Sequence, residues 1–130
     1  MKKVNILVFI LPILLVFLVN ILYRSFIAPG TIVVDVEFNK KEYYRGDLVI
    51  IKVYLRKKRF LWSQPLVGRD VGVQVDDSAG NIVYIDQSRT NADGYAVFSF
   101  RLSKFCRTGV YKVHVVVRGY YKVVEFNVKG

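Results

Sequence analysis

The chain has 130 residues, which is enough for one domain of common size and too short to add a second, catalytic domain. Hydrophobic residues make up 53% of the chain, with the excess concentrated in its first quarter, and the formal net charge is +10. A single cysteine, Cys106, excludes an internal disulfide, so stability must come from the core or from partners. We interpret this thiol as a structural residue rather than a nucleophile.

The first predicted element is an apolar helix at the N-terminus. Residues 4–23 carry no charged side chain, and as a helix they would be about 30 Å long, the thickness of a bilayer hydrocarbon core. Pro12 is tolerated in spanning helices, and Tyr23 and Arg24 would lie at the interface. The sequence therefore predicts a cytoplasmic N-terminus and a transmembrane helix over residues 1–23.

A cleavable signal peptide is the alternative for this segment. Its apolar core is usually about 7 to 15 residues long and ends at a small-x-small site, whereas here Ala28 has Phe26 two positions earlier. Lys2 and Lys3 favour a cytoplasmic N-terminus. We therefore expect a single-pass protein of the cell membrane, with residues 24–30 as a linker to an extracytoplasmic C-terminal domain.

From residue 31 onward the hydrophobic period changes to two, which is typical of antiparallel strands separated by glycine-containing turns. The predicted strands cover residues 31–38, 48–55, 69–76, 81–87, 95–102, 110–118 and 120–128. Inward positions are occupied mainly by valine, isoleucine, phenylalanine and leucine, together with Ala96 and Tyr111. The expected fold class is all-β, a seven-stranded immunoglobulin-like sandwich over residues 31–130 preceded by one transmembrane α-helix.

The order of the turn residues carries a family resemblance. Residues 39–55 (NKKEYYRGDLVIIKVYL) contain a Tyr-x-x-Gly-Asp opening, and residues 71–80 (VGVQVDDSAG) a V-x-V-x-D strand. Residues 90–100 (TNADGYAVFSF) then supply a T-x-x-x-G turn, and residues 109–111 (GVY) a G-x-Y strand. Over residues 35–128 the chain resembles macroglobulin-like domains, such as the second one of alpha-2-macroglobulins, and bacterial and archaeal Ig-like repeats. The resemblance implies a fold rather than an activity.

A basic and aromatic cluster is the strongest candidate for a docking surface. Residues 56–62 (RKKRFLW) fall in the long loop expected after the second strand, at the membrane end of the sandwich. The turn between the last two strands is expected at the same end. Cations and aromatic side chains favour anionic lipid head groups or the rim of a neighbouring protein. The predicted docking residues are Arg56, Lys57, Lys58, Arg59, Phe60, Trp62, Arg118, Tyr120, Tyr121 and Lys122.

A second possible protein contact lies at the opposite end of the sandwich. An exposed Tyr43-Tyr44-Arg45 group has the composition of a binding hot spot. The resemblance gives the same residues a structural role as the turn that opens the second strand.

The sequence offers little for catalysis. His114, the single histidine, is expected to point outward from the middle of its strand, and Cys106 lies too far along the chain for a local Cys-His pair. Asp76, Asp77 and Asp93 occur in turns, where aspartate is favoured for its own hydrogen bonds. We therefore predict no enzyme activity, no metal, no cofactor, no small-molecule substrate and no nucleic-acid partner.

The expected function is that of an interaction or structural subunit in a membrane or cell-surface assembly. Its expected partners are membrane lipids and other membrane or cell-surface protein subunits. Three alternatives stay open: a component that pairs through an exposed edge strand in a surface layer or filament, an accessory subunit of a membrane enzyme whose active site lies on other chains, and a secreted binding module.

Overall fold

The computed structural model describes residues 6–24 and 30–130, with the side chains of the helix described from Ile10 onward. These residues form two compact units. One contains helix α1 (Ile6–Leu22) and the segment Lys57–Gln64, and the other contains Val33–Arg56 and Pro65–Gly130.

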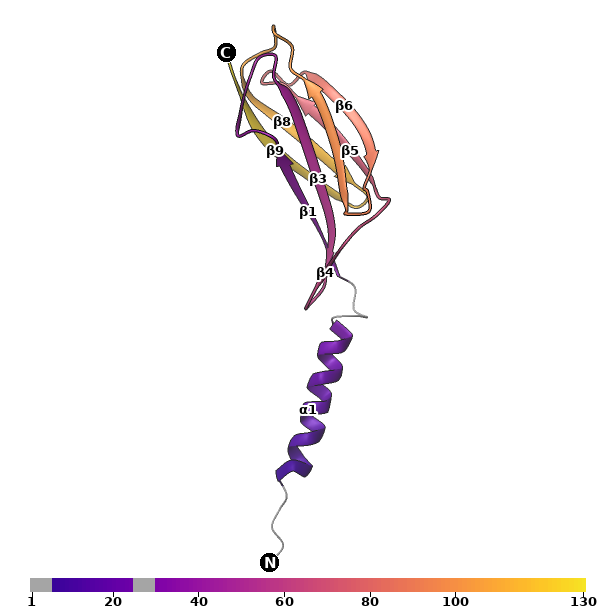
Figure 1. Cartoon of the computed structure of the whole chain (residues 1–130). Coiled ribbons are helices and arrows are strands. Elements are labelled where there is room, and N and C mark those ends of the chain that lie inside the picture. The colour runs from indigo at the N-terminus through magenta and orange to yellow at the C-terminus, as the bar shows by residue number, and fades with distance from the viewer. Residues whose placement is uncertain (1–5, 25–29) are drawn as a thin grey trace, which may run out of the picture. The chain divides into compact units, whose positions relative to one another are not determined.

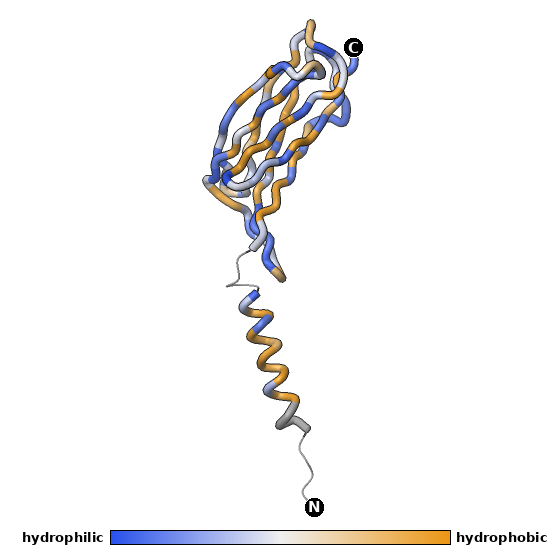
Figure 2. Tube along the Cα trace, turned by 180° about the vertical axis from the view of Figure 1, so that it is seen from behind, coloured by the Kyte–Doolittle hydropathy of each residue, from blue (hydrophilic) through white to orange (hydrophobic). Residues whose placement is uncertain are grey.

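Helix α1 is shorter than the sequence predicts. Its 17 residues, which include Pro12, form about 25 Å of helix, less than the roughly 30 Å hydrocarbon core. Figure 2 shows that most of α1 is hydrophobic. In the described ranges 6–24 and 30–130, however, no helix is both long enough and apolar enough to cross a bilayer. The expected transmembrane helix is therefore wrong, as is the single-pass membrane location that depended on it. Residues 1–5, which include the predicted cytoplasmic end, and residues 25–29 of the predicted linker 24–30 lie outside the described part.

The second unit is a sandwich of two sheets (Figure 1). In one sheet, β3 lies between β1 and β7, and β4 also pairs with β3; the other sheet has the order β2-β9-β8-β5-β6. Strand β2 is parallel to β9, whereas β9, β8, β5 and β6 pair antiparallel in turn. The strands are β1 (Thr31–Phe38), β2 (Glu42–Tyr44), β3 (Leu48–Lys58), β4 (Ser63–Pro65), β5 (Asp70–Asp76), β6 (Ile82–Arg89), β7 (Tyr95–Arg101), β8 (Gly109–Val117) and β9 (Tyr120–Lys129).

The core lies between the two sheets and follows the alternation of the sequence. Strands β3, β5 and β8 each bury every second residue, as the burial of Val71, Val73 and Val75 illustrates. A cluster of aromatic rings closes one part of the core around Phe126, which packs against Phe38, Tyr43 and Tyr111. The predicted β-sandwich is therefore confirmed: the alternating apolar side chains of the two sheets face one another and are removed from water between them.

The strand boundaries differ from the prediction in two places. The short strands β2 and β4 are additional, and β3 continues to Lys58 rather than ending at Leu55. Three-residue strands give too little alternation to be recognised in a sequence. The extension of β3 is stabilised by pairing with β4. The charged residues at 56–58 give no sign of this pairing in the sequence.

The turn between β5 and β6 depends on the Asp77 carboxylate. One of its oxygens accepts hydrogen bonds from the backbone N–H groups of Ala79 and Asn81, both at 2.9 Å. Arg107 lies 3.9 Å from the other oxygen. The hydrogen bond from Asn81 is the main reason why the pKa of Asp77 is lowered from its usual value of 3.8.

This lowered pKa predicts a loss of stability in acid. The charged carboxylate stabilises the fold above the unfolded-state pKa of 3.8, and this contribution disappears as the pH falls through the lower folded-state value. Asp77→Asn removes the titration but keeps an acceptor oxygen. Urea midpoints measured from neutral pH to pH ~2 should fall less steeply for Asp77→Asn than for the natural chain. Parallel curves would show that Asp77 is not linked to folding.

Candidate functional site

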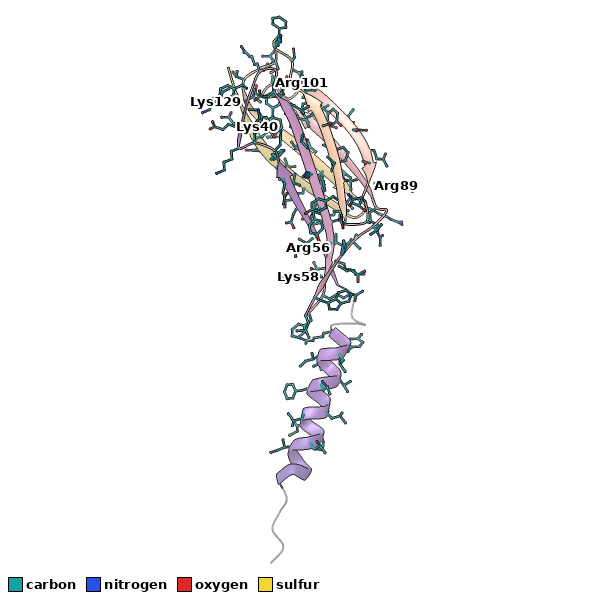
Figure 3. The ribbon with its side chains drawn as sticks, viewed as in Figure 1. Lys40, Arg56, Lys58, Arg89, Arg101 and Lys129 are labelled. Atoms are coloured by element: carbon teal, nitrogen blue, oxygen red, sulfur yellow. The ribbon has the colours of Figure 1, made fainter. Side chains whose placement is uncertain are left out.

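The predicted docking residues are divided between the two units. Arg56, Lys57 and Lys58 lie on strand β3 and not in a loop (Figure 3 labels Arg56 and Lys58). Arg56 is half-buried, and its Nε lies 3.5 Å from a carboxylate oxygen of Asp35. The expectation of a loop is therefore wrong, and the Arg56 charge is already paired inside the domain.

The remainder of the cluster forms the tip of the β3–β4 hairpin. The Arg59 N–H donates to the Trp62 carbonyl at 2.7 Å, which places Phe60 and Leu61 at the end of a tight turn. Phe60, Leu61 and Trp62 are all exposed. The Arg59 guanidinium lies 5.6 Å from the centre of the Trp62 ring, and that of Arg24 lies 5.9 Å from the Phe60 ring. The hairpin tip thus presents apolar side chains next to cations.

The turn between β8 and β9 does not present its residues in one direction. Tyr120 packs against the core. The Lys122 ammonium donates to the Val34 carbonyl at 3.0 Å, and Arg118 is exposed. Tyr121 is also exposed, but its ring lies on the outer face of the five-stranded sheet. Of the predicted turn residues, only Arg118 and Tyr121 are therefore available to a partner.

The distal Tyr43-Tyr44-Arg45 group is not exposed as predicted. Tyr43 is fully buried, and its hydroxyl donates to the Asn39 side-chain oxygen at 2.5 Å. Burial raises the pKa of Tyr43 above its usual value. Tyr44 and Arg45 are exposed, although the Arg45 Nε donates to the Cys106 carbonyl at 2.8 Å. The structural role implied by the family resemblance therefore describes Tyr43 better than a contact role.

The outer face of the five-stranded sheet brings together residues that the sequence analysis did not group. Strand registers place Gln74 of β5 between Ile85 of β6 and His114 of β8, and His114 beside Val123 of β9. The neighbouring row contains Gln87, Gly72, Val116 and Tyr121. We call these eight residues the outer-face patch. They come from four strands, so only the register of the folded sheet makes them neighbours.

A hydrogen-bonded row fixes the middle of the outer-face patch. His114 Nε2 lies 2.9 Å from an Asp76 carboxylate oxygen, and His114 Nδ1 bonds to the Tyr121 hydroxyl. The Gln74 amide donates to the second Asp76 oxygen at 2.9 Å. With neutral imidazole, Nε2–H donates to the carboxylate and Nδ1 accepts the phenol proton. The row holds the Tyr121 ring in place and leaves neither imidazole nitrogen free to act as a base.

The apolar members of the patch remain in contact with solvent. Ile85 is 68% exposed, and Tyr121, Val116 and Val123 are also exposed. A groove of about 400 Å³ lies between Ile85 and Val116, with Gly72 and Gln74 in its lining. Exposed apolar groups that are contiguous and rimmed by polar ones are typical of interaction surfaces. A fixed tyrosine adds contact area with little conformational entropy left to lose on binding.

The free edge of β6 is a poor site for adding another strand. Asp86 lies opposite the buried Val73, so it is on the core-facing side at the edge of the sheet. Its carboxylate accepts hydrogen bonds from the Tyr84 hydroxyl at 2.9 Å and from the Gln87 N–H at 2.8 Å. Burial and the hydrogen bond to Asp86 raise the pKa of Tyr84 to about 12. A charged side chain that points inward on an edge strand prevents pairing with another strand. The outer-face patch is therefore a better candidate for a binding surface than the β6 edge.

Comparison with known proteins supports the fold. No protein-family model matches the sequence, and no curated protein matches it. Among solved structures, the native conformation of Escherichia coli alpha-2-macroglobulin matches 82% of this chain with a TM-score of 0.65 and 18% identity. The trypsin-activated form matches 82% with a TM-score of 0.65 and 19% identity, and the form activated by porcine elastase matches 75% with 0.63 and 18%.

A macroglobulin-like domain therefore fits this chain, which agrees with the resemblance in the turn motifs. At this level of identity the likeness concerns the fold alone. The chain spans only 7 to 8% of the length of the E. coli proteins that it matches.

Proposed function

We propose that the chain is a non-catalytic interaction module that binds a protein partner through its outer-face patch, as a subunit of a larger assembly. The observation that carries this proposal is the group of exposed apolar side chains around a tyrosine fixed by His114 and Asp76. These residues are not needed to fill the core, which lies on the other side of the same sheet.

The chemistry of the patch favours binding over catalysis. His114 bonds through both ring nitrogens, and Cys106 lines a separate hollow of about 280 Å³ together with Tyr111 and Leu102. A nucleophile activated by a free base is therefore not assembled among these residues. The E. coli alpha-2-macroglobulins contain a similar domain as a small part of a much larger chain, which supports a structural or interaction role.

The proposal is tested by placing a charge in the patch. Val116 and Val97 are matched, since they are 51% and 50% exposed and lie on strands of opposite sheets. When the tagged full chain is purified from its native host, Val116→Arg should lose a protein that co-purifies with the natural chain, and Val97→Arg should retain it. Both variants should unfold within about 0.5 kcal/mol of the natural chain. Retention of every partner by Val116→Arg would overturn the proposal.

A further inference from the structure

The tip of the β3–β4 hairpin presents large apolar side chains on a tight turn. The turn is closed by the hydrogen bond from the Arg59 N–H to the Trp62 carbonyl, at 2.7 Å. Phe60 and Leu61 at its end are 56% and 66% exposed, and Trp62 is 39% exposed. A rigid protein partner would need a pocket shaped to this tip, whereas a fluid partner can close around it.

The part of the chain that holds the tip carries only positive charge. All ten acidic residues belong to the larger unit, so the smaller unit, with α1 and Lys57–Gln64, contains none. Lys57 and Lys58 directly precede the tip (Figure 3 labels Lys58). Among the described residues, neither lysine takes part in an ion pair. The exposed apolar tip is therefore followed, along the hairpin, by cations that no carboxylate neutralises.

This arrangement matches the interface of an anionic bilayer. Tryptophan prefers the level of the head groups, apolar side chains prefer the acyl boundary, and lysines are attracted to anionic lipids. We propose that the hairpin tip binds peripherally to an anionic membrane surface, with Phe60 and Leu61 at the acyl boundary and Lys57 and Lys58 at the head-group phosphates. This contact requires no segment to cross the bilayer. It shares no residue with the outer-face patch, so it is a second binding surface of the chain.

Trp62 is the only tryptophan of the chain, so its fluorescence reports on the tip itself. The full chain is transferred from mild detergent into vesicles of phosphatidylcholine, or of equal parts phosphatidylcholine and phosphatidylglycerol, with acyl chains brominated near the head group. Because α1 also exposes apolar side chains, binding of the whole chain to vesicles would not by itself test the tip. On the mixed vesicles the Trp62 emission should shift to shorter wavelength and be quenched by bromine, and on phosphatidylcholine alone it should change much less.

Two pairs of lysines test the contribution of charge. Lys57→Ser/Lys58→Ser should lower the docking constant of the tip about tenfold or more, because both head-group contacts are lost. Lys41→Ser/Lys104→Ser is the matched control. It removes the same charge from exposed positions of the larger unit that form no ion pair among the described residues. This control should show the same quenching as the natural chain.

Phe60→Ser/Leu61→Ser tests the apolar contribution while it keeps Trp62 and every charge. It should also reduce the quenching, because less apolar area is removed from water at the acyl boundary. None of the substituted side chains belongs to the core. Every variant should therefore unfold at the same urea concentration as the natural chain when unfolding is followed by circular dichroism.

The inference is overturned if Trp62 is quenched equally on the two kinds of vesicle, or on neither. It is also overturned if the two lysine variants behave alike. Loss of a co-purifying protein by Phe60→Ser/Leu61→Ser, without quenching of Trp62 by lipid, would overturn it in favour of a protein partner at the tip. The Val116→Arg co-purification concerns other residues, so failure of the lipid contact is distinguishable from failure of the proposed function.

Discussion

Gly94→Ala should lower the free energy of unfolding by about 2–5 kcal/mol. Gly94 has φ +85°, and a Cβ there would lie 2.7 Å from the Leu55 carbonyl oxygen and 2.9 Å from Pro65 Cβ. The Gly94 carbonyl also accepts a hydrogen bond from the Leu55 N–H at 2.9 Å, so the strands cannot move apart without breaking it. Urea denaturation measures the change.

Gly80→Ala is a matched control for this prediction. Gly80 has the same φ of +85°, but a Cβ at this position meets nothing within 4 Å. Gly80→Ala should lower the free energy of unfolding by about 1 kcal/mol, the cost of a positive φ in alanine without any steric clash. Equal losses in the two variants would show that the close approach to Leu55 and Pro65 does not contribute.

Phe126→Ala should destabilise the sandwich by about 3–5 kcal/mol. The ring is buried, and its centre lies 5.5 Å from that of Phe38, 5.1 Å from that of Tyr43 and 5.2 Å from that of Tyr111. Truncation removes buried apolar area and leaves a cavity that the surrounding rings cannot fill without changing rotamers. Thermal and urea unfolding both measure the loss.

Phe105→Ala serves as the control, because Phe105 is 94% exposed. Its substitution should change the free energy of unfolding by no more than about 0.5 kcal/mol. A loss below about 1.5 kcal/mol for Phe126→Ala would contradict the assignment of the aromatic cluster to the core.

The core could be predicted because it depends on a local regularity. The alternation predicted over residues 48–55, 69–76 and 110–118 puts their apolar side chains inward, and the structure buries Val53, Val73 and Val113 in these strands. The glycine-containing turns could be predicted as well, and Gly80 and Gly94 both have the positive φ that such turns require. Period two and turn chemistry are properties of a few consecutive residues, so a single sequence contains them.

Two expectations failed because the local sequence pattern on which each rested does not determine the length of a helix or the burial of a side chain. Twenty uncharged residues at 4–23 suggested a bilayer crossing, but the helix covers only Ile6–Leu22. Tyr43 looked like a surface residue in a polar turn. The parallel pairing of β2 with β9 instead turns its ring into the core beside Phe126.

The sequence by itself determined the all-β class, the alternation of the core strands, the glycine turns and the basic, aromatic composition of the hairpin. Only the tertiary structure decided the outer-face patch. Asp76 and His114 lie 38 positions apart, and they become neighbours because β5 and β8 pair in one register. A shift of one residue would turn His114 toward the core, so its contacts with Asp76 and Tyr121 depend on packing of the whole sandwich.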